Sequence, residues 1–89
     1  MKHIDYKIPG GKMIRLDVEL EEELIRCIRI TGDFFVHPET AIVDLENFLL
    51  ERKVTEKLVG DVEEFLEKHG IRMIGITARH LVESLLKAL

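Results

Sequence analysis

The chain has 89 residues, of which 46% are hydrophobic and 34% are charged. This length allows one small core and this composition is typical of a folded protein, so we expect a single domain spanning residues 1–89. The net charge of −4 argues against a general nucleic-acid-binding protein, which usually has a concentrated basic face.

Compartment is indicated by three further features of the chain. No stretch approaches the length of a membrane span, and the polar start Met1-Lys2-His3 lacks the apolar centre of a signal peptide. The single cysteine, Cys27, excludes an internal disulfide and a multi-cysteine metal cage. We therefore expect a cytoplasmic protein without a membrane partner. Glutamine is absent and Glu, Lys and Arg are plentiful, which is typical of heat-adapted proteins.

Alternating apolar and polar residues predict three strands in the first part of the chain, over residues 3–8, 12–20 and 24–31. The second strand is the clearest, because Ile14, Leu16, Val18 and Leu20 face one way. Polar residues 21–23 make the following turn, but without Asn-Gly or Asp-Gly they leave the hairpin register open.

The third predicted strand has apolar residues on both faces. Ile28 and Ile30 share one face, and Ile25 and Cys27 share the other, so we expect the strand to be covered on both sides for part of its length. Cys27 follows Arg26, which can activate a thiol. The alternative is that Cys27 is a small buried hydrophobic residue.

After Gly32-Asp33 the apolar period changes from two to about 3.6, which predicts three helices. Pro38 suits the first position of the first helix, with His37 at its N-cap. Thr55 is the expected N-cap of the second helix and Thr77 that of the third. The predicted apolar stripes are Ala41, Ile42, Leu45, Phe48 and Leu49, then Leu58, Val59, Val62, Phe65 and Leu66, and finally Leu81, Val82, Leu85, Leu86 and Leu89.

Between the last two helices, Gly70 is a stop signal and residues 71–76 form a short extended segment that can add a strand. Strands followed by helices predict an α+β fold. It consists of an antiparallel β-hairpin or three-stranded sheet with about three helices packed on one face.

The first candidate site is the turn Pro9-Gly10-Gly11-Lys12. Successive glycines allow backbone N–H groups to converge on an anion, and Lys12 adds a positive charge. The alternative is a type II turn with Pro9 second and Gly10 third, where a positive φ is required. The turn alone does not explain why Gly11 and Lys12 follow.

The second candidate site is Gly32-Asp33-Phe34-Phe35, followed closely by His37. Adjacent aromatic residues point in different directions, so at most one enters the core and the other is free to anchor a partner. The alternative is that both lie beneath the first helix. Asp33 can cap a turn or bind a lysine, and capping is the commoner role.

The remaining polar residues suggest no active site. The histidines His3, His37, His69 and His80 lack the spacing of metal ligands, so no metal site is expected. Arg15, Arg26 and Arg29 can form a positive stripe on the hairpin, although cross-strand pairing with Asp17 and Glu19 is the favoured interpretation. Because no arrangement of a nucleophile with a general base is indicated, the chain is predicted to be an accessory protein with no catalytic residue.

Residues 6–15 and 28–39, which contain the two signatures, resemble the C-terminal accessory domain of lipoate–protein ligases. That domain has a K-x-P-G-G-K-L turn, a hairpin, an I-T-G-D-F-F-like strand end, and a G-I-x-x-x-G segment that matches residues 70–75. Met13 replaces leucine in the first motif. In some archaea this domain is a separate small subunit, and a free chain of 89 residues beginning at Met1 is similar to that arrangement.

The resemblance implies a non-catalytic subunit that has no activity alone. A large catalytic subunit would bind ATP, magnesium and lipoate, form lipoyl-adenylate with the help of this chain, and lipoylate a lysine of an acceptor protein. This chain would bind no cofactor itself. Gly10, Gly11 and Lys12 would contact the adenylate or a loop of the partner, and Asp33, Phe34, Phe35 and His37 would form the partner interface. The alternative is a stand-alone protein-interaction or anion-binding module with no ligase role.

Overall fold

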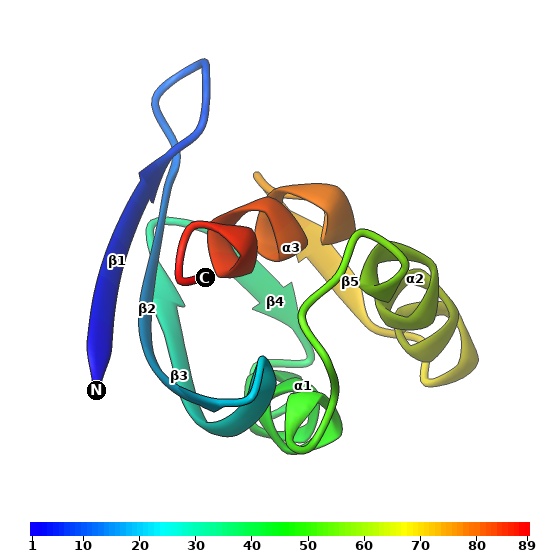
Figure 1. Cartoon of the computed structure of the whole chain (residues 1–89). Helices are drawn as coiled ribbons and strands as arrows, with labels where there is room; N and C mark the ends of the chain where they lie inside the picture. Colours follow the sequence, from blue (N-terminus) through cyan, green and yellow to red (C-terminus); the bar gives the residue numbers. More distant parts are fainter.

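The computed structural model describes residues 1–89 and has the α+β organisation that the sequence predicts (Figure 1). Strands β1, β2 and β3 form one antiparallel sheet in that order, and β4 and β5 form a separate two-stranded ribbon. The elements are β1 (Lys2–Lys7), β2 (Met13–Glu21), β3 (Leu24–Gly32), β4 (Phe35–His37), α1 (Ala41–Leu49), α2 (Leu58–Lys68), β5 (Arg72–Ile74) and α3 (Ala78–Leu86).

The register of the β2–β3 hairpin is set by a two-residue turn of glutamates. Glu22 and Glu23 have φ angles of 52° and 68°, and Glu21 lies opposite Leu24. Positive φ at both central positions gives a turn whose twist matches that of the flanking strands. The turn is therefore tight even though it lacks the Asn-Gly or Asp-Gly pair that usually indicates one.

A β-bulge in β3 contradicts the predicted faces of this strand. Glu19 pairs with Cys27 whereas Leu20 pairs with Ile25, so one extra residue lies between them on β3. An extra residue shifts the alternation by one position. Ile25 therefore joins Ile28 on the buried face, and Cys27 is exposed. The expectation that Cys27 and Ile25 share a covered face was wrong.

The helices cover the inner face of the three-stranded sheet, as predicted. Helix α3 packs against β1 and β2, α1 packs against β3, and α2 packs on α3 (Figure 1). Ile14, Leu16 and Val18 have no exposed surface beneath them. Phe48 of α1 stacks on Phe65 of α2 with ring centroids 4.2 Å apart. The last stripe residue, Leu89, departs from the prediction, because it follows the end of α3 and is 54% exposed.

Two of the predicted helix signals are present. The Thr77 side chain accepts a hydrogen bond from the His80 N–H, and the His80 ring accepts one from the Thr77 N–H, which forms a capping box at the start of α3. Gly70 has a φ of 64° after α2, and the Ile71 N–H donates to the Leu66 carbonyl over 2.8 Å. This is the pattern of a Schellman motif, so Gly70 ends the helix as expected.

The two other helix starts differ from the prediction. Helix α2 begins at Leu58, with Thr55 in the preceding turn rather than at the N-cap. Pro38 follows a cis peptide bond and its carbonyl accepts the Ala41 N–H in the turn before α1, so it is not the first helical residue. His37 belongs to β4 and caps no helix.

The β4–β5 ribbon is the main element that the sequence patterns do not indicate. The predicted extended segment does contain a strand, β5, but this strand pairs antiparallel with β4 and does not join the larger sheet. With three residues each, the two strands are too short to show a period of two. The ribbon lies apart from the three-stranded sheet (Figure 1).

The outer face of the three-stranded sheet carries ion pairs in a pattern that the sequence did not predict. None of the ion pairs joins an arginine to Asp17 or Glu19, and Asp17 contacts His3 instead. The arginine pairs are Arg15–Asp5, Arg26–Glu21 and Arg26–Glu51. No helix of the structure is long and apolar enough to cross a membrane.

Candidate functional site

The loop between β1 and β2 is a hydrogen-bonded turn that projects beyond the sheet (Figure 1). The Gly11 N–H donates to the Ile8 carbonyl over 3.1 Å, and Gly10 at the third position has a φ of 105°. The Ile8 N–H in turn donates to the Lys12 carbonyl over 2.7 Å. Of the two interpretations the structure shows the turn, and the Gly11 amide is already used within it. An anion cradle that needs this amide is not formed.

The two sequence signatures meet directly where β2 begins and β3 ends. The Met13 N–H donates to the Asp33 carboxylate over 2.6 Å, and the Asp33 N–H donates to the Met13 carbonyl over 3.2 Å. Gly32 allows this approach, because a Cβ there would lie 2.2 Å from the Met13 carbonyl oxygen. Asp33 thus fixes the backbone that follows Lys12 and binds no lysine.

A third segment, after β5, lies beside Lys12 at the same end of the molecule. A Cβ on Gly75 would lie 3.4 Å from Cε of Lys12 and 3.6 Å from Cβ of Phe34. The lysine stem therefore crosses the bare backbone of Gly75, whose φ of 99° also favours glycine. Segments from positions 12, 34 and 75 converge here, and the stem of the exposed Lys12 side chain lies against Gly75.

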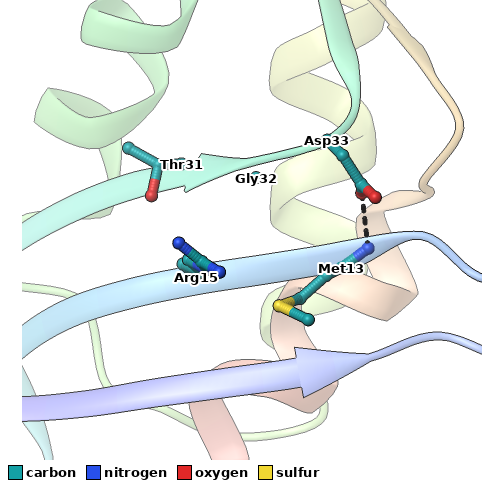
Figure 2. A pocket seen from close by; sticks show the side chains of 5 residues that line it. All are labelled: Met13, Arg15, Thr31, Gly32 and Asp33. Atoms are coloured by element: carbon teal, nitrogen blue, oxygen red, sulfur yellow. Dashed lines mark hydrogen bonds between the residues drawn. The ribbon is translucent and has the colours of Figure 1, made fainter.

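Beside this point, Met13, Arg15, Thr31, Gly32 and Asp33 line a surface hollow of about 380 Å³ (Figure 2). Figure 2 shows the Arg15 and Met13 side chains on β2 next to Thr31 and Asp33, with the hydrogen bond between Asp33 and Met13 at one end. The Arg15 side chain is 58% exposed and its Nε lies 3.8 Å from Asp5. The hollow thus presents one guanidinium and one carboxylate, each already in contact with another group of the chain.

The aromatic pair divides between the core and the surface. Phe34 is half-buried and packs against the core, whereas Phe35 is 71% exposed. The alternative in which both rings lie under the first helix is therefore excluded. His37 lies two residues after Phe35 on β4 and is also exposed.

Three residues of this region were not identified as site residues from the sequence: Arg72, Ile74 and Gly75. Arg72 pairs with His37 and Ile74 pairs with Phe35 across the ribbon. Gly75 was part of the G-I-x-x-x-G match, but the match did not say which side chain it faces. Only the pairing of β4 with β5 places these residues next to the first two signatures.

None of the groups with a shifted pKa belongs to this region. No group of three or more His, Cys, Asp or Glu side chains is arranged to hold a metal ion. The hydrogen bond from His3 to Asp17 raises the pKa of the His3 imidazole, and the negative charge of Asp5 raises it further. The hydrogen bond between Tyr6 and Glu83 likewise raises the pKa of the Tyr6 hydroxyl.

The fold and the meeting of the glycine signatures at one end define a small α+β domain without an active site of its own. No family model matches the chain. It is 30% identical over 73 residues to lipoate-protein ligase A subunit 2 of Thermoplasma acidophilum, and the match covers 82% of this chain and 76% of that protein.

Structural similarity extends over almost the whole chain. A solved structure of an archaeal lipoylation system from Thermoplasma acidophilum, a bipartite lipoate protein ligase with its E2 lipoyl domain, contains a chain that superposes with a TM-score of 0.78. Sequence identity is 28%, and the match covers 96% of this chain and 93% of that one. The chain belongs to the family of small subunits of bipartite lipoate–protein ligases, which confirms the resemblance found in the sequence.

Proposed function

We propose that this chain is the accessory subunit that a catalytic partner requires for ATP-dependent adenylation of lipoate, and that it contributes neither a nucleophile nor a general base. The large subunit binds ATP, magnesium and lipoate, and it then transfers the lipoyl group to a lysine of an acceptor protein. Membership of the small-subunit family supports the existence of this partner. The Thermoplasma lipoylation system includes an E2 lipoyl domain, which supports a carrier domain as the acceptor.

The observation that carries the proposal is the support given to Lys12. Its carbonyl accepts the Ile8 N–H, Asp33 holds the next residue of the backbone, and its stem lies against Gly75. Adenylation gathers negative charge around the α-phosphate of ATP, and a preorganised positive group stabilises such charge in the transition state. Lys12 acts in this way on the nucleotide directly or by holding a loop of the partner closed over it.

Closure also explains why a separate subunit is useful for this step. An acyl-adenylate is hydrolysed by water, and a site that closes around it excludes water and strengthens the electrostatic contacts inside. A small domain that docks beside the nucleotide provides this closure without its own nucleophile or base.

The test measures lipoyl-adenylate formation by the catalytic subunit with and without this chain, using ATP, magnesium and lipoate. We expect adenylate to accumulate only when both chains are present, whereas transfer from preformed lipoyl-adenylate to the acceptor depends on this chain much less. Full adenylation by the catalytic subunit alone would contradict the proposal. It would favour the alternative, a stand-alone interaction or anion-binding module.

A further inference from the structure

The outward face of the β4–β5 ribbon consists of two cross-strand pairs. Phe35 lies opposite Ile74, and His37 lies opposite Arg72. Phe35 is 71% exposed and Ile74 is 50% exposed, so two large apolar side chains lie next to each other on the surface. On the opposite face of the ribbon, Met73 packs against the core.

An apolar groove continues this face. It has a volume of about 280 Å³, and its apolar lining includes Phe35 itself together with Ile30, Phe34, Val36 and Ile42. Because Phe35 belongs to both the groove and the ribbon face, the two form one surface. We refer to Phe35, Ile74, His37, Arg72 and this groove as the ribbon surface.

The other exposed apolar residues do not form a comparable surface. Met1 and Leu89 are the chain ends, and Val43 and Leu50 lie in or just after α1. Single exposed apolar side chains are normal on soluble proteins, whereas adjacent ones mark interaction sites. The outer face of the three-stranded sheet is polar, and several of its charged groups contact one another.

The charges on the ribbon surface indicate what kind of partner it fits. Neither His37 nor Arg72 takes part in an ion pair within the chain, and Arg72 provides a fixed positive charge beside the apolar pair. The Glu39 carboxylate lines the groove on the other side of Phe35, so the positive charge of this surface lies at the ribbon and the negative charge lies in the groove. The chain as a whole has a net charge of −4, so the rest of its surface repels an acidic partner. A partner with carboxylates next to an apolar pocket is therefore attracted to this face in one orientation.

We propose that the ribbon surface is the docking site for the catalytic subunit, which receives Phe35 and Ile74 in an apolar pocket flanked by carboxylates that pair with Arg72. This inference rests on the proposed function, because that function supplies the partner. Exposed aromatic and arginine side chains are the residues that most often dominate the binding energy of protein interfaces. A second copy of this chain fits poorly when the two-fold axis runs along the strands, since that arrangement would bring Arg72 of the two copies together.

Docking here also brings Lys12 to the partner. Ile74 directly precedes Gly75, against which the Lys12 stem lies, and Phe35 directly follows Phe34. A partner that binds Phe35 and Ile74 therefore touches the residues adjacent to the support of Lys12. The proposed catalytic contribution and the docking surface lie on one end of the molecule.

The experiment measures the affinity of the full chain for the catalytic subunit by titration calorimetry. Phe35→Glu and Ile74→Glu are the test variants, and Leu89→Glu is the matched control, because Leu89 is 54% exposed and Ile74 is 50% exposed. We expect each test variant to weaken binding about 30-fold or more, as for a central interface residue. Leu89→Glu should bind like the wild type, and all three should keep the wild-type melting temperature.

Arg72→Glu tests the charge part of the proposal. It should lower the association rate and remove most of the dependence of that rate on salt, since a steering charge acts mainly during encounter. Phe35→Glu lies on β4 and Ile74→Glu lies on β5. If one of these two variants has a folding defect, the other still reports on the surface, so the test stays decisive.

The docking site would be overturned by any of three results. In the first, Phe35→Glu and Ile74→Glu match Leu89→Glu in affinity, and in the second, Leu89→Glu loses binding to the same extent as they do. In the third, sedimentation of the chain alone shows that Phe35→Glu removes self-association and leaves partner binding intact. Failure of the proposed function gives a different result, in which the wild-type chain binds the catalytic subunit through this surface but does not increase adenylate formation.

Discussion

The three-stranded sheet and the two-stranded ribbon use their apolar residues in opposite ways. The sheet turns Ile14, Leu16 and Val18 inward, where none of them has exposed surface, and its outer face is covered with polar groups that pair with one another. The ribbon does the reverse. Its outward face carries Phe35 and Ile74 with most or half of their surface exposed.

This difference separates what stabilises the domain from what it offers to a partner. Burial of an isoleucine or leucine contributes about 1.5–3 kcal/mol, so the inner face of the sheet accounts for much of the stability. The exposed pair on the ribbon contributes little to folding because most of its surface remains in water. Substitutions in the two regions should therefore affect different measurements.

The largest effect is expected for Leu16→Asp at the centre of the sheet. The change removes the burial of Leu16 and places a carboxylate in a site with no exposed surface and no partner. Small domains are stable by about 5–15 kcal/mol, and this one has only 89 residues. We therefore expect the Leu16→Asp variant to be unfolded at moderate temperature. Circular dichroism and thermal melting give the measurement. A soluble Leu16→Asp variant that melts cooperatively would contradict the role of this face.

The next effect concerns activity rather than folding, at the junction between the two regions. Lys12→Ala should leave the melting temperature and the affinity for the catalytic subunit nearly unchanged. It should slow lipoyl-adenylate formation about 100-fold, which corresponds to about 2.7 kcal/mol of transition-state energy. Transfer from preformed lipoyl-adenylate should change much less, because that step no longer needs the pyrophosphate leaving group.

Lys7→Ala is the matched control for Lys12, since it removes an exposed lysine at the other end of the same loop. Adenylation should continue at the wild-type rate in this variant. If Lys12→Ala also adenylates at the normal rate in a saturated complex, the glycine turn has only a structural role, and the subunit acts through its surface alone.

A smaller effect distinguishes Phe34 from its neighbour. Phe34 is half-buried against the core, so Phe34→Ala should cost about 2 kcal/mol, roughly half the cost of truncating a fully buried phenylalanine. This lowers the melting temperature by roughly 10 °C for a domain of this size. Phe35→Ala should change the stability by less than about 0.5 kcal/mol, because that side chain is exposed. Equal melting temperatures for the two variants would show that the rings are not divided between core and surface.

The same contrast explains how much could be predicted from the sequence. The period of two in β2 and the period of 3.6 in α1, α2 and α3 are long enough to identify these elements and their buried faces. The end of α2 at Gly70 and the cap at Thr77 were also readable, because each depends on local hydrogen bonds. The ribbon depends on pairing between strands of three residues that lie far apart in the sequence.

The candidate site, like the fold, was predictable where it depends on local sequence and not where it depends on contacts between distant segments. Sequence patterns identified Gly10, Gly11, Lys12 and the residues from Asp33 onward, but treated them as two separate signatures. Their meeting through Met13 and Asp33, and the position of Gly75 beside Lys12, depend on tertiary contacts. The wrong face for Cys27 has a similar cause, since one inserted residue in β3 reverses the alternation without leaving a signal in composition.

The smallest effect belongs to the polar outer face of the sheet and concerns His3. Its imidazole Nδ1 lies 2.6 Å from Asp17 Oδ1 and its Nε2 lies 3.2 Å from Asp5 Oδ1. The hydrogen bond to Asp17 and the charge of Asp5 favour the protonated ring, so the pKa of His3 is raised above its ordinary value of 6.5. A raised folded-state pKa means that the contribution to stability is fully present below the unfolded pKa. It is lost as the pH rises through the folded pKa. The ring is exposed, so this contribution is small. NMR titration of the His3 imidazole should therefore give a pKa above 6.5 that falls towards this value in Asp17→Asn, whereas Asp44→Asn on α1 should leave it unchanged. An equal response to the two substitutions would show that these contacts do not organise the outer face. The contrast between a sheet face of paired polar groups and a ribbon face of exposed apolar groups would then not hold.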